Sequence, residues 1–235
     1  MEPDAYREMA ATEGRHWWFA GRRAILSALI SRFELSPTAK ILELGCGTGG
    51  NLDMLRRFGE VAAMETDDAA RAIALEKTGG RFDIRPGRCP DRIPFAGQRF
   101  DLVCMIDVLE HIDQDVATLL ALRGLLAPGG RVLITVPANP WMWSQHDEFL
   151  HHKRRYTAAE LREKALQAGL EISLLTYFNT LLFPLAATAR LLNVEGSDVP
   201  PAPLNRLLQA VFSAERFVAG RVALPFGVSL LAVLG

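Results

Sequence analysis

The run I-L-E-L-G-C-G-T-G-G-N at residues 41–51 constrains the fold more than any other stretch of this chain. Apolar residues on both sides of Glu43 predict a short strand that is buried on both faces. The glycines that follow predict a tight turn into a helix beginning near Asn51. Such a turn, at the carboxyl end of a buried strand, is suited to a nucleotide-like ligand, so the sequence predicts an α/β fold with a ligand there.

Two cofactors compete for this turn. Gly45, Gly47 and Gly50 satisfy the dinucleotide pattern G-x-G-x-x-G, and Glu65 follows about twenty residues later, where an acid binds a ribose. Glu43 distinguishes between the two cofactors, because the pyrophosphate of a dinucleotide prefers the positive end of a helix without a nearby carboxylate. S-adenosylmethionine has no phosphate and carries an ammonium and a sulfonium. We therefore expect S-adenosylmethionine, with S-adenosylhomocysteine as product, and keep a nicotinamide-dependent oxidoreductase as an alternative.

The glycine run resembles the first motif of class I S-adenosylmethionine-dependent methyltransferases. The phrases "FDLV", "DVLEH" and "LAPGGRVLITVP" match later segments of the same superfamily, and the resemblance covers about residues 39–177. It is similar to small bacterial members that include the ubiquinone-biosynthesis O-methyltransferase group. The resemblance implies a Rossmann-like, seven-stranded, mostly parallel sheet in the order 3-2-1-4-5-7-6, with helices on both faces.

The resemblance and the strand pattern together place the cofactor at the carboxyl ends of successive strands. Glu65 ends the second strand, where its carboxylate is expected to accept hydrogen bonds from both ribose hydroxyls. Arg88 stands where the family usually has an Asp for adenine, so adenine contact is expected from the backbone around Cys89 or from Thr66. The expected cofactor-binding residues are Trp18, Arg22, Glu43, Gly45, Cys46, Gly47, Glu65, Thr66, Cys89, Asp107 and Val108.

The aromatic run before Arg22 has two interpretations. Trp17, Trp18 and Phe19 can form a plug that packs a helix onto the edge of the sheet. Alternatively, these aromatics and Arg22 cover the cofactor, with the guanidinium reaching its carboxylate.

Methyl transfer from a sulfonium is an in-line displacement, and holding the two reactants together supplies about 7–11 kcal/mol of the barrier. A general base for an acceptor hydroxyl adds roughly 10²–10⁴-fold. His111, after the fourth strand, and His146, which Asp147 can orient, are the candidate catalytic residues. The alternative is that each is an ordinary histidine of a polar loop.

A metal ion is a third interpretation of the same region. Asp107, Glu110 and His111 resemble the E-x-x-E-H signature with which ubiquinone-pathway and small-RNA methyltransferases hold a divalent cation. The shell would be completed by His146, His151 or His152. Many metal-free members carry D-V-L-E-H as well, so we assign no metal ligands and keep a divalent metal as an alternative.

The expected organisation has four parts: an N-terminal helical cover over 1–36, a core over 37–177, an apolar helical cap over 178–226 and a last strand over 227–235. Residues 138–156 are too long and too aromatic for an ordinary connection, so we interpret them as a substrate lid. The cap either covers an apolar substrate pocket, docks on a bilayer near a lipid-linked substrate, or packs into the core.

Composition excludes several classes of function. The net charge of −1 over 235 residues, with both signs spread along the chain, argues against nucleic acid as a partner. Three cysteines without C-x-x-C spacing argue against a disulfide framework or a zinc site and favour a reducing cytoplasm. The acidic N-terminus predicts no secretory signal, and Pro184 and Arg190 interrupt the apolar run that would otherwise suggest a membrane span.

We therefore expect a cytoplasmic enzyme, with contact to the inner face of the membrane as an extension of that expectation. The expected reaction is O-methylation of a small or lipid-linked metabolite, such as a glycan, phenolic or natural-product intermediate. A non-catalytic cofactor-binding or scaffold protein is the alternative, and the sequence predicts no oligomeric state.

Overall fold

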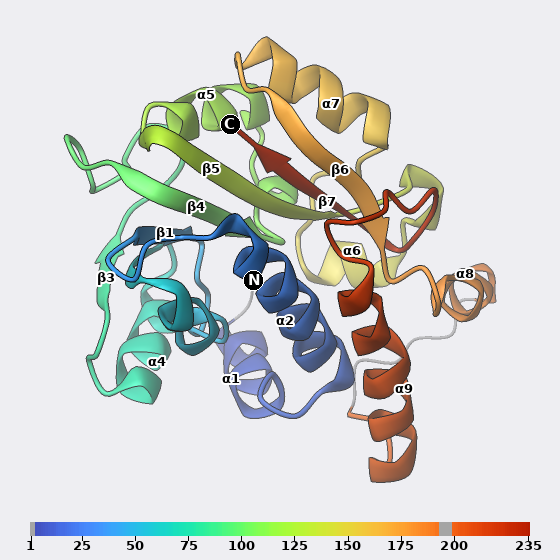
Figure 1. Cartoon of the computed structure of the whole chain (residues 1–235). Coiled ribbons are helices and arrows are strands. Elements are labelled where there is room, and N and C mark those ends of the chain that lie inside the picture. Colours follow the sequence, from blue (N-terminus) through green and yellow to red (C-terminus); the bar gives the residue numbers. More distant parts are fainter. Residues whose placement is uncertain (1–2, 193–198) are drawn as a thin grey trace.

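A seven-stranded sheet lies at the centre of the protein, in the order β3-β2-β1-β4-β5-β7-β6 (Figure 1). The computed structural model describes residues 3–192 and 199–235. The neighbouring strands pair in parallel, except that β7 runs antiparallel to both β5 and β6. The predicted strand order and the mostly parallel sheet are confirmed. The strands are β1 (Lys40–Leu44), β2 (Glu60–Glu65), β3 (Asp83–Pro86), β4 (Phe100–Ile106), β5 (Leu126–Pro137), β6 (Ile172–Phe178) and β7 (Ser229–Leu234).

Helices cover both faces of this sheet, which is why its central strands are apolar on both sides. Ile41 of β1 packs toward α2 and α9, whereas its neighbour Leu42 packs toward α5 and α7. Glu43 is on the same face as Ile41, because side chains alternate along a strand, so its carboxylate lies on the side of α2. The helices in chain order are α1 (Pro3–Thr12), α2 (Trp17–Ile30), α3 (Leu52–Leu55), α4 (Asp68–Thr78), α5 (Asp115–Arg123), α6 (Gln145–Phe149), α7 (Ala158–Gln167), α8 (Phe183–Leu191) and α9 (Ala202–Ala214), with 3₁₀ turns η1 (Ser31–Phe33), η2 (Arg56–Phe58), η3 (Leu109–His111), η4 (Pro140–Met142) and η5 (Glu215–Phe217).

The segment over 138–156 has more regular structure than an irregular loop. It contains η4 and α6, and its two ends are tied where the Asn139 N–H donates to the Tyr156 carbonyl at 2.9 Å. Between them, the Lys153 N–H donates to the carbonyl of Glu110 in η3 at 2.8 Å. The segment is therefore anchored to the end of β4, while its role as a substrate lid stays a prediction.

The C-terminal helices α8 and α9 lie between β6 and β7 in the chain, and α9 packs along α2 (Figure 1). The proposed part boundaries stay predictions; residues 1–2 of the cover and 193–198 of the cap lie outside the described residues. Within the described ranges, no helix has the length and apolarity that crossing a membrane requires.

Candidate active site

The glycine turn after β1 is shaped by a close approach from the end of β4. Gly45 has φ +73°, and a Cβ on it would lie 2.7 Å from both methyl carbons of Val108. Glycine is therefore required at position 45 for its left-handed backbone and for the space that Val108 takes. The N–H groups of Gly45 and Cys46 both donate to the Met64 carbonyl of β2, at 2.8 and 3.1 Å. These contacts bring together three expected site residues, Gly45, Cys46 and Val108.

Glu43 is a buried acid with one unoccupied oxygen. The side-chain amide of Asn51 donates to Glu43 Oε1 at 2.8 Å, whereas Oε2 finds no hydrogen-bond partner among the described residues. Burial raises the pKa of Glu43 to about 7, and the Asn51 bond and the charge of Arg22 oppose that rise. A positive group beside Oε2 would stabilise the carboxylate form, so this position suits a cationic ligand.

Glu65 closes the glycine turn from the end of β2. Its carboxylate accepts hydrogen bonds from the N–H groups of Gly47, Thr66 and Asp67 at 2.7, 2.8 and 2.9 Å. A carboxylate offers about four acceptor sites, so about one is left for another donor. From the sequence, Glu65 is expected to bind the ribose hydroxyls alone. The structure adds that the same carboxylate holds the glycine turn in place.

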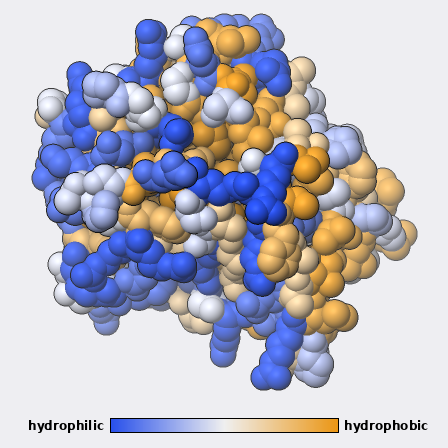
Figure 2. All heavy atoms as spheres, in the orientation of Figure 1, coloured by the Kyte–Doolittle hydropathy of each residue, from blue (hydrophilic) through white to orange (hydrophobic). Residues whose placement is uncertain are grey.

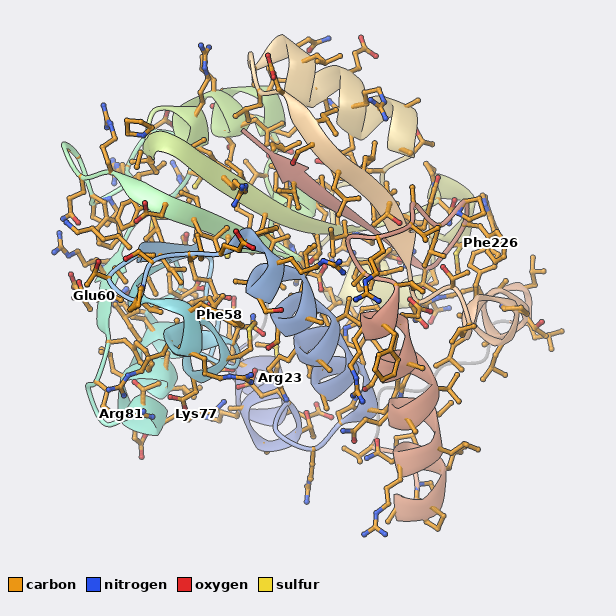
Figure 3. All side chains as sticks on the ribbon, in the orientation of Figure 1. Arg23, Phe58, Glu60, Lys77, Arg81 and Phe226 are labelled. Carbon is orange, nitrogen blue, oxygen red and sulfur yellow. The ribbon has the colours of Figure 1, made fainter. Side chains whose placement is uncertain are left out.

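Glu13, which sequence reasoning missed, fastens the N-terminal cover onto this turn. Its Oε1 accepts the Thr48 hydroxyl at 2.7 Å and pairs with the Lys77 ammonium, and its Oε2 lies 2.0 Å from where a Cβ on Gly50 would be. The Arg23 guanidinium donates to the Glu13 carbonyl at 2.8 Å. Figure 3 shows Arg23 and Lys77 reaching toward α1 from α2 and α4. No motif surrounds Glu13, and its side-chain partners lie 35 and 64 residues away.

Asp107 and Arg22 meet at the carboxyl end of β4. Asp107 has φ +54°, and its N–H donates to the Thr135 carbonyl at 3.0 Å while the Thr135 hydroxyl donates to Oδ1 at 2.7 Å. The Arg22 guanidinium forms an ion pair with Oδ2. Arg22 Nε is buried and makes no hydrogen bond within the described part of the chain. Arg22 thus lies at the expected edge of the sheet, and its contact with a cofactor carboxylate stays a prediction.

Trp18 lies in an aromatic contact between α2 and α9. Its ring centroid is 5.1 Å from that of Phe212 and 6.2 Å from that of Phe178, and all three rings are stacked. This placement is what the packing interpretation of the aromatic run expects. The cofactor role of Trp18 stays a prediction.

The two candidates for adenine contact, Thr66 and Cys89, follow the ends of the neighbouring strands β2 and β3. The Thr66 hydroxyl donates to the Gly87 carbonyl at 2.7 Å, so it is already engaged with the loop after β3. The Cys89 side chain is buried in the core, and burial raises the pKa of its thiol to about 12. Any contact of Cys89 with a ligand would therefore come from its backbone, as expected.

The structure brings His111, one of the two candidate catalytic histidines, next to His152. The rings of His111 and His152 are 4.8 Å apart, and His152 Nδ1 lies 2.8 Å from Asp147 Oδ1. His152 Nε2 lies 4.0 Å from Oε1 of Glu110, a fully buried acid whose two oxygens accept no hydrogen bond within residues 3–192 and 199–235. Burial and the charge of Asp107 raise the pKa of Glu110 well above its ordinary value.

The expectation that Asp147 orients His146 is wrong. The Asp147 carboxylate accepts from the Ser144 N–H, contacts His152 and pairs with Arg155 Nε at 2.9 Å. Consecutive residues of a helix point in different directions, so adjacency in sequence did not bring His146 to this carboxylate. Burial and the charge of Arg190 lower the pKa of His146 to about 4.

Glu110, His111 and His152 are also the one group within residues 3–192 and 199–235 that is arranged to hold a metal ion, with ligand atoms within 4.8 Å of one another. Asp107, the first residue of the D-x-x-E-H signature, is not part of this group, because Arg22 and Thr135 engage its carboxylate. The sequence resemblance named Asp107, Glu110 and His111 as the ligand set, to be completed by His146, His151 or His152. The structure replaces Asp107 with His152.

A groove of about 670 Å³ lies at the opposite edge of the sheet, beside the starts of β1 and β2. It is lined by Phe58, Glu60 and Arg81, which Figure 3 labels, and by Ile30 at the C-terminal end of α2. Ligands of parallel α/β sheets bind at the carboxyl ends of the strands, so this groove is not the expected cofactor site.

The residues at the glycine turn fit S-adenosylmethionine on three counts. Glu43 Oε2, which accepts no hydrogen bond among the described residues, suits a cation, the glycine at position 47 with φ +54° puts no side chain between the turn and a ligand, and Glu65 keeps acceptor capacity. Each of these features belongs to the carboxyl ends of β1 and β2. A nicotinamide dinucleotide fits less well, because its pyrophosphate would lie beside Glu43.

Comparisons with known proteins agree with this geometry. A family model described as a methyltransferase domain matches residues 18–175. A ubiquinone biosynthesis O-methyltransferase from Cereibacter sphaeroides is 36% identical over 107 residues, which cover 43% of this chain and 42% of that protein. The chain thus matches less than half the length of this relative.

Solved structures share the fold. A chain from the complex between the Haloferax volcanii Trm112 methyltransferase activator and a putative methyltransferase is 20% identical with a TM-score of 0.64, over 97% of this chain and 96% of that chain. Phosphoethanolamine N-methyltransferase 2 of Haemonchus contortus, in complex with S-adenosyl-L-methionine, is 18% identical with a TM-score of 0.60, over 88% of this chain and 51% of that chain. At these identities the likeness concerns the fold alone.

The predicted family, fold and cofactor class are confirmed by these matches. The chain belongs to the methyltransferase domain family and has the fold of the S-adenosylmethionine-dependent methyltransferases.

Proposed function

We propose that this protein transfers a methyl group from S-adenosylmethionine to an oxygen of a small or lipid-linked metabolite. The observation that carries the proposal is the buried Glu43 carboxylate beside the glycine turn, with an oxygen that has no partner in the described ranges. A buried acid is costly unless a charge or a donor compensates it. A cationic cofactor supplies that compensation.

The chain's own residues hold the cofactor and the acceptor. Glu43 faces the positive charge, and Glu65 binds a ribose hydroxyl while it keeps the turn folded. The cofactor supplies an electrophilic methyl group when it is bound. In the reaction, the bond between sulfur and methyl breaks, the bond between methyl and the acceptor oxygen forms, and the hydroxyl proton passes to a base.

His111 is the better placed of the two candidate bases. It lies in η3 directly after β4 and the expected cofactor residues Asp107 and Val108, whereas His146 lies on α6 within the segment 138–156. Burial and the neighbouring His152 lower the pKa of His111 to about 4, so its imidazole is neutral at neutral pH. His152, held through Nδ1 by Asp147, lies next to it.

The choice of oxygen as acceptor is supported by the ubiquinone biosynthesis O-methyltransferase relatives. Acceptors of the phenolic, glycan and natural-product classes have hydroxyl groups that a neutral imidazole can deprotonate as the methyl group is transferred. Nitrogen or carbon acceptors are the outcomes that product analysis would reveal instead.

A divalent metal is the second candidate for activating the acceptor. Glu110, His111 and His152 would hold it, and the contact between His152 Nδ1 and Asp147 resembles the support that metal-bound imidazoles receive from carboxylates. Such an ion would polarise the acceptor hydroxyl in place of a base. His111 would then be a ligand and could not take the proton.

Calorimetric titration with S-adenosylhomocysteine tests the cofactor half of the proposal. We expect Glu65→Ala to weaken binding strongly, because it removes a ribose acceptor and releases three backbone donors of the turn. Glu110→Gln should leave the affinity unchanged and serves as the matched control. No binding at millimolar ligand would reject the proposal, and the reverse ranking of the two variants would reject the role of Glu65.

Transfer of a labelled methyl group tests the acceptor half. Wild-type protein and His111→Ala, each shown to bind S-adenosylhomocysteine equally, would be incubated with labelled cofactor and fractionated metabolite and lipid extracts. We expect His111→Ala to transfer label about 10²–10⁴-fold more slowly. Equal rates would remove His111 as the base, and binding without transfer to any fraction would favour a scaffold role.

A further inference from the structure

Helix α1 turns one face toward the glycine turn that follows β1. Spacings of three and four residues return to the same side of a helix, so Tyr6, Met9 and Glu13 lie on one face. Tyr6 and Met9 are partly buried and Glu13 is buried, whereas Arg7 and Glu8 are exposed. The helix packs against α4, around which Figure 2 shows a mainly hydrophilic surface. The face with Tyr6 and Met9 is therefore turned inward, toward the turn.

Met9 borders the part of the turn that a ligand is expected to approach. Its Cε lies 3.4 Å from where a Cβ on Gly47 would be. The Gly47 N–H in turn donates to the Glu65 carboxylate at 2.7 Å, so Met9 lies next to the backbone that leads to the expected ribose acceptor. A methionine is unbranched and has three rotatable bonds, which lets it pack on a ligand of irregular shape.

Glu13 fixes the position of this face of α1. Its N–H donates to the Met9 carbonyl at 2.7 Å, so it continues the helix. Its carboxylate accepts the Thr48 hydroxyl at 2.7 Å and pairs with the Lys77 ammonium, which belong to the turn and to α4. Polar contacts therefore hold α1 at the turn, with Met9 opposite Gly47.

Tyr6 lies about one helical turn before Met9, roughly 5 Å along the axis of α1. Burial and the charges of Glu65 and Asp67 raise the pKa of Tyr6 to about 12, so its hydroxyl is near these two carboxylates at the end of β2. The hydroxyl keeps its proton at neutral pH and can donate a hydrogen bond.

The hydrogen bonds of Glu65 leave a ribose with one hydroxyl to satisfy. Three backbone N–H groups already donate to this carboxylate, so about one of its four acceptor sites is left. A ribose of an adenosyl group presents two neighbouring hydroxyls, and each can donate or accept. One hydroxyl can donate to Glu65, and the second needs another partner on the same side of the turn.

We propose that α1 forms the outer wall of the cofactor site, with the Tyr6 hydroxyl donating to a ribose hydroxyl of S-adenosylmethionine and Met9 packing on the same ligand beside Gly47. The ribose then lies between an acceptor, Glu65, and a donor, Tyr6, which together satisfy both of its hydroxyls. The inference rests on the proposed function, because it adds two residues to the same cofactor site.

Removing the Tyr6 hydroxyl tests the hydrogen bond. The test variant is Tyr6→Phe. The matched control is Tyr177→Phe, which removes the hydroxyl of a partly buried tyrosine in β6, at the opposite edge of the sheet from β3. Urea unfolding shows that both variants are folded, and calorimetric titration measures their affinity for S-adenosylhomocysteine. We expect Tyr6→Phe to bind roughly 2–10-fold more weakly than the wild type, and Tyr177→Phe to bind equally well.

An analogue of S-adenosylhomocysteine without the two ribose hydroxyls distinguishes contact from packing. Tyr6→Phe and the wild type should bind this analogue with equal affinity, because the hydrogen bond has lost its partner. A hydroxyl that only shapes α1 would weaken the binding of both ligands by the same factor, and that result would overturn the proposal. Equal affinity of all three proteins for S-adenosylhomocysteine would overturn it as well.

Hydrogen exchange of the wild-type protein tests the wall itself. We expect bound S-adenosylhomocysteine to slow the exchange of the α1 amides more than that of the α7 amides, which serve as the internal control. Equal changes in the two helices would remove α1 from the site. A wild-type protein that binds no S-adenosylhomocysteine would reject the proposed function and this inference together, whereas binding that Tyr6→Phe leaves unchanged rejects this inference alone.

Discussion

Replacing Glu43 with Gln isolates the negative charge at the end of β1, because Gln has almost the same shape and no charge. The new amide also has a partner available. Asn51 Oδ1 is buried without a hydrogen bond among the described residues, so a flip of the Asn51 amide lets it accept from Gln. Glu43→Gln therefore removes the negative charge and keeps one hydrogen bond between residues 43 and 51.

The magnitude follows from the pKa. Burial raises the pKa of Glu43 from 4.5 to about 7, so the folded chain holds this proton more tightly than the unfolded chain does. The free energy of unfolding consequently falls as the pH rises from 4.5 through about 7, by a total of about 3 kcal/mol. Glu43→Gln has no such proton. We expect it to match the wild type near pH 5 and to exceed it by about 3 kcal/mol at pH 8.

Cofactor binding should move in the opposite direction. Losing a hydrogen bond to a charged group costs about 1.5–3 kcal/mol, so Glu43→Gln should bind S-adenosylmethionine about 10–100-fold more weakly at pH 8. The wild-type affinity should rise from pH 6 to pH 8 as Glu43 ionises, and that of the variant should not.

Urea unfolding at the two pH values and calorimetric titration measure these effects on the same samples. Glu110→Gln is the control, since it also removes a fully buried acid with a raised pKa but one that makes no hydrogen bond to the glycine turn within residues 3–192 and 199–235. It should gain stability at pH 8 and keep its cofactor affinity. A Glu43→Gln protein that is less stable at pH 8, or that binds the cofactor as tightly as the wild type, would refute the role of this charge.

Three further changes test the site and its supports. Gly45→Ala should lose stability and cofactor binding, because its Cβ would collide with the Val108 side chain. Adding Val108→Ala relieves this collision but not the backbone strain at φ +73°, which costs about 1–3 kcal/mol. Urea unfolding of the double variant should therefore show only partial recovery of stability. Asp147→Asn leaves Arg155 unpaired and should cost about 3–5 kcal/mol at pH 7. The pKa of Asp147 is held below its ordinary 3.8, so the stability that its carboxylate provides is present above pH 3.8 and is lost at lower pH. In acid unfolding, the difference in free energy of unfolding between Asp147→Asn and the wild type should therefore shrink as the pH falls. Dialysis against a chelator should leave methyl transfer unchanged if His111 is the base; loss that Mg²⁺ or Zn²⁺ restores would instead assign a metal to Glu110 and His111.

Local patterns were sufficient for the fold and the cofactor turn. The alternation of apolar residues in the strands, and the glycines after Glu43, act over a few neighbouring residues, so the sequence by itself predicted the sheet, its order by resemblance and the position of the turn. The preference for S-adenosylmethionine over a pyrophosphate cofactor likewise needed only the charge of Glu43 beside Gly45. These features depend on covalent neighbours and on strand periodicity, both of which can be read along the chain.

Only the tertiary structure decided which distant side chains meet. It attached Glu13 to the glycine turn, placed Trp18 on Phe212, and brought His152 rather than His146 to Asp147. It also turned the leucines of α8 outward, where helical periodicity alone predicts burial. The physical reason is that such contacts join segments far apart in the chain. Their partners are set by how helices and strands pack, and a pattern of a few residues contains no information on that packing.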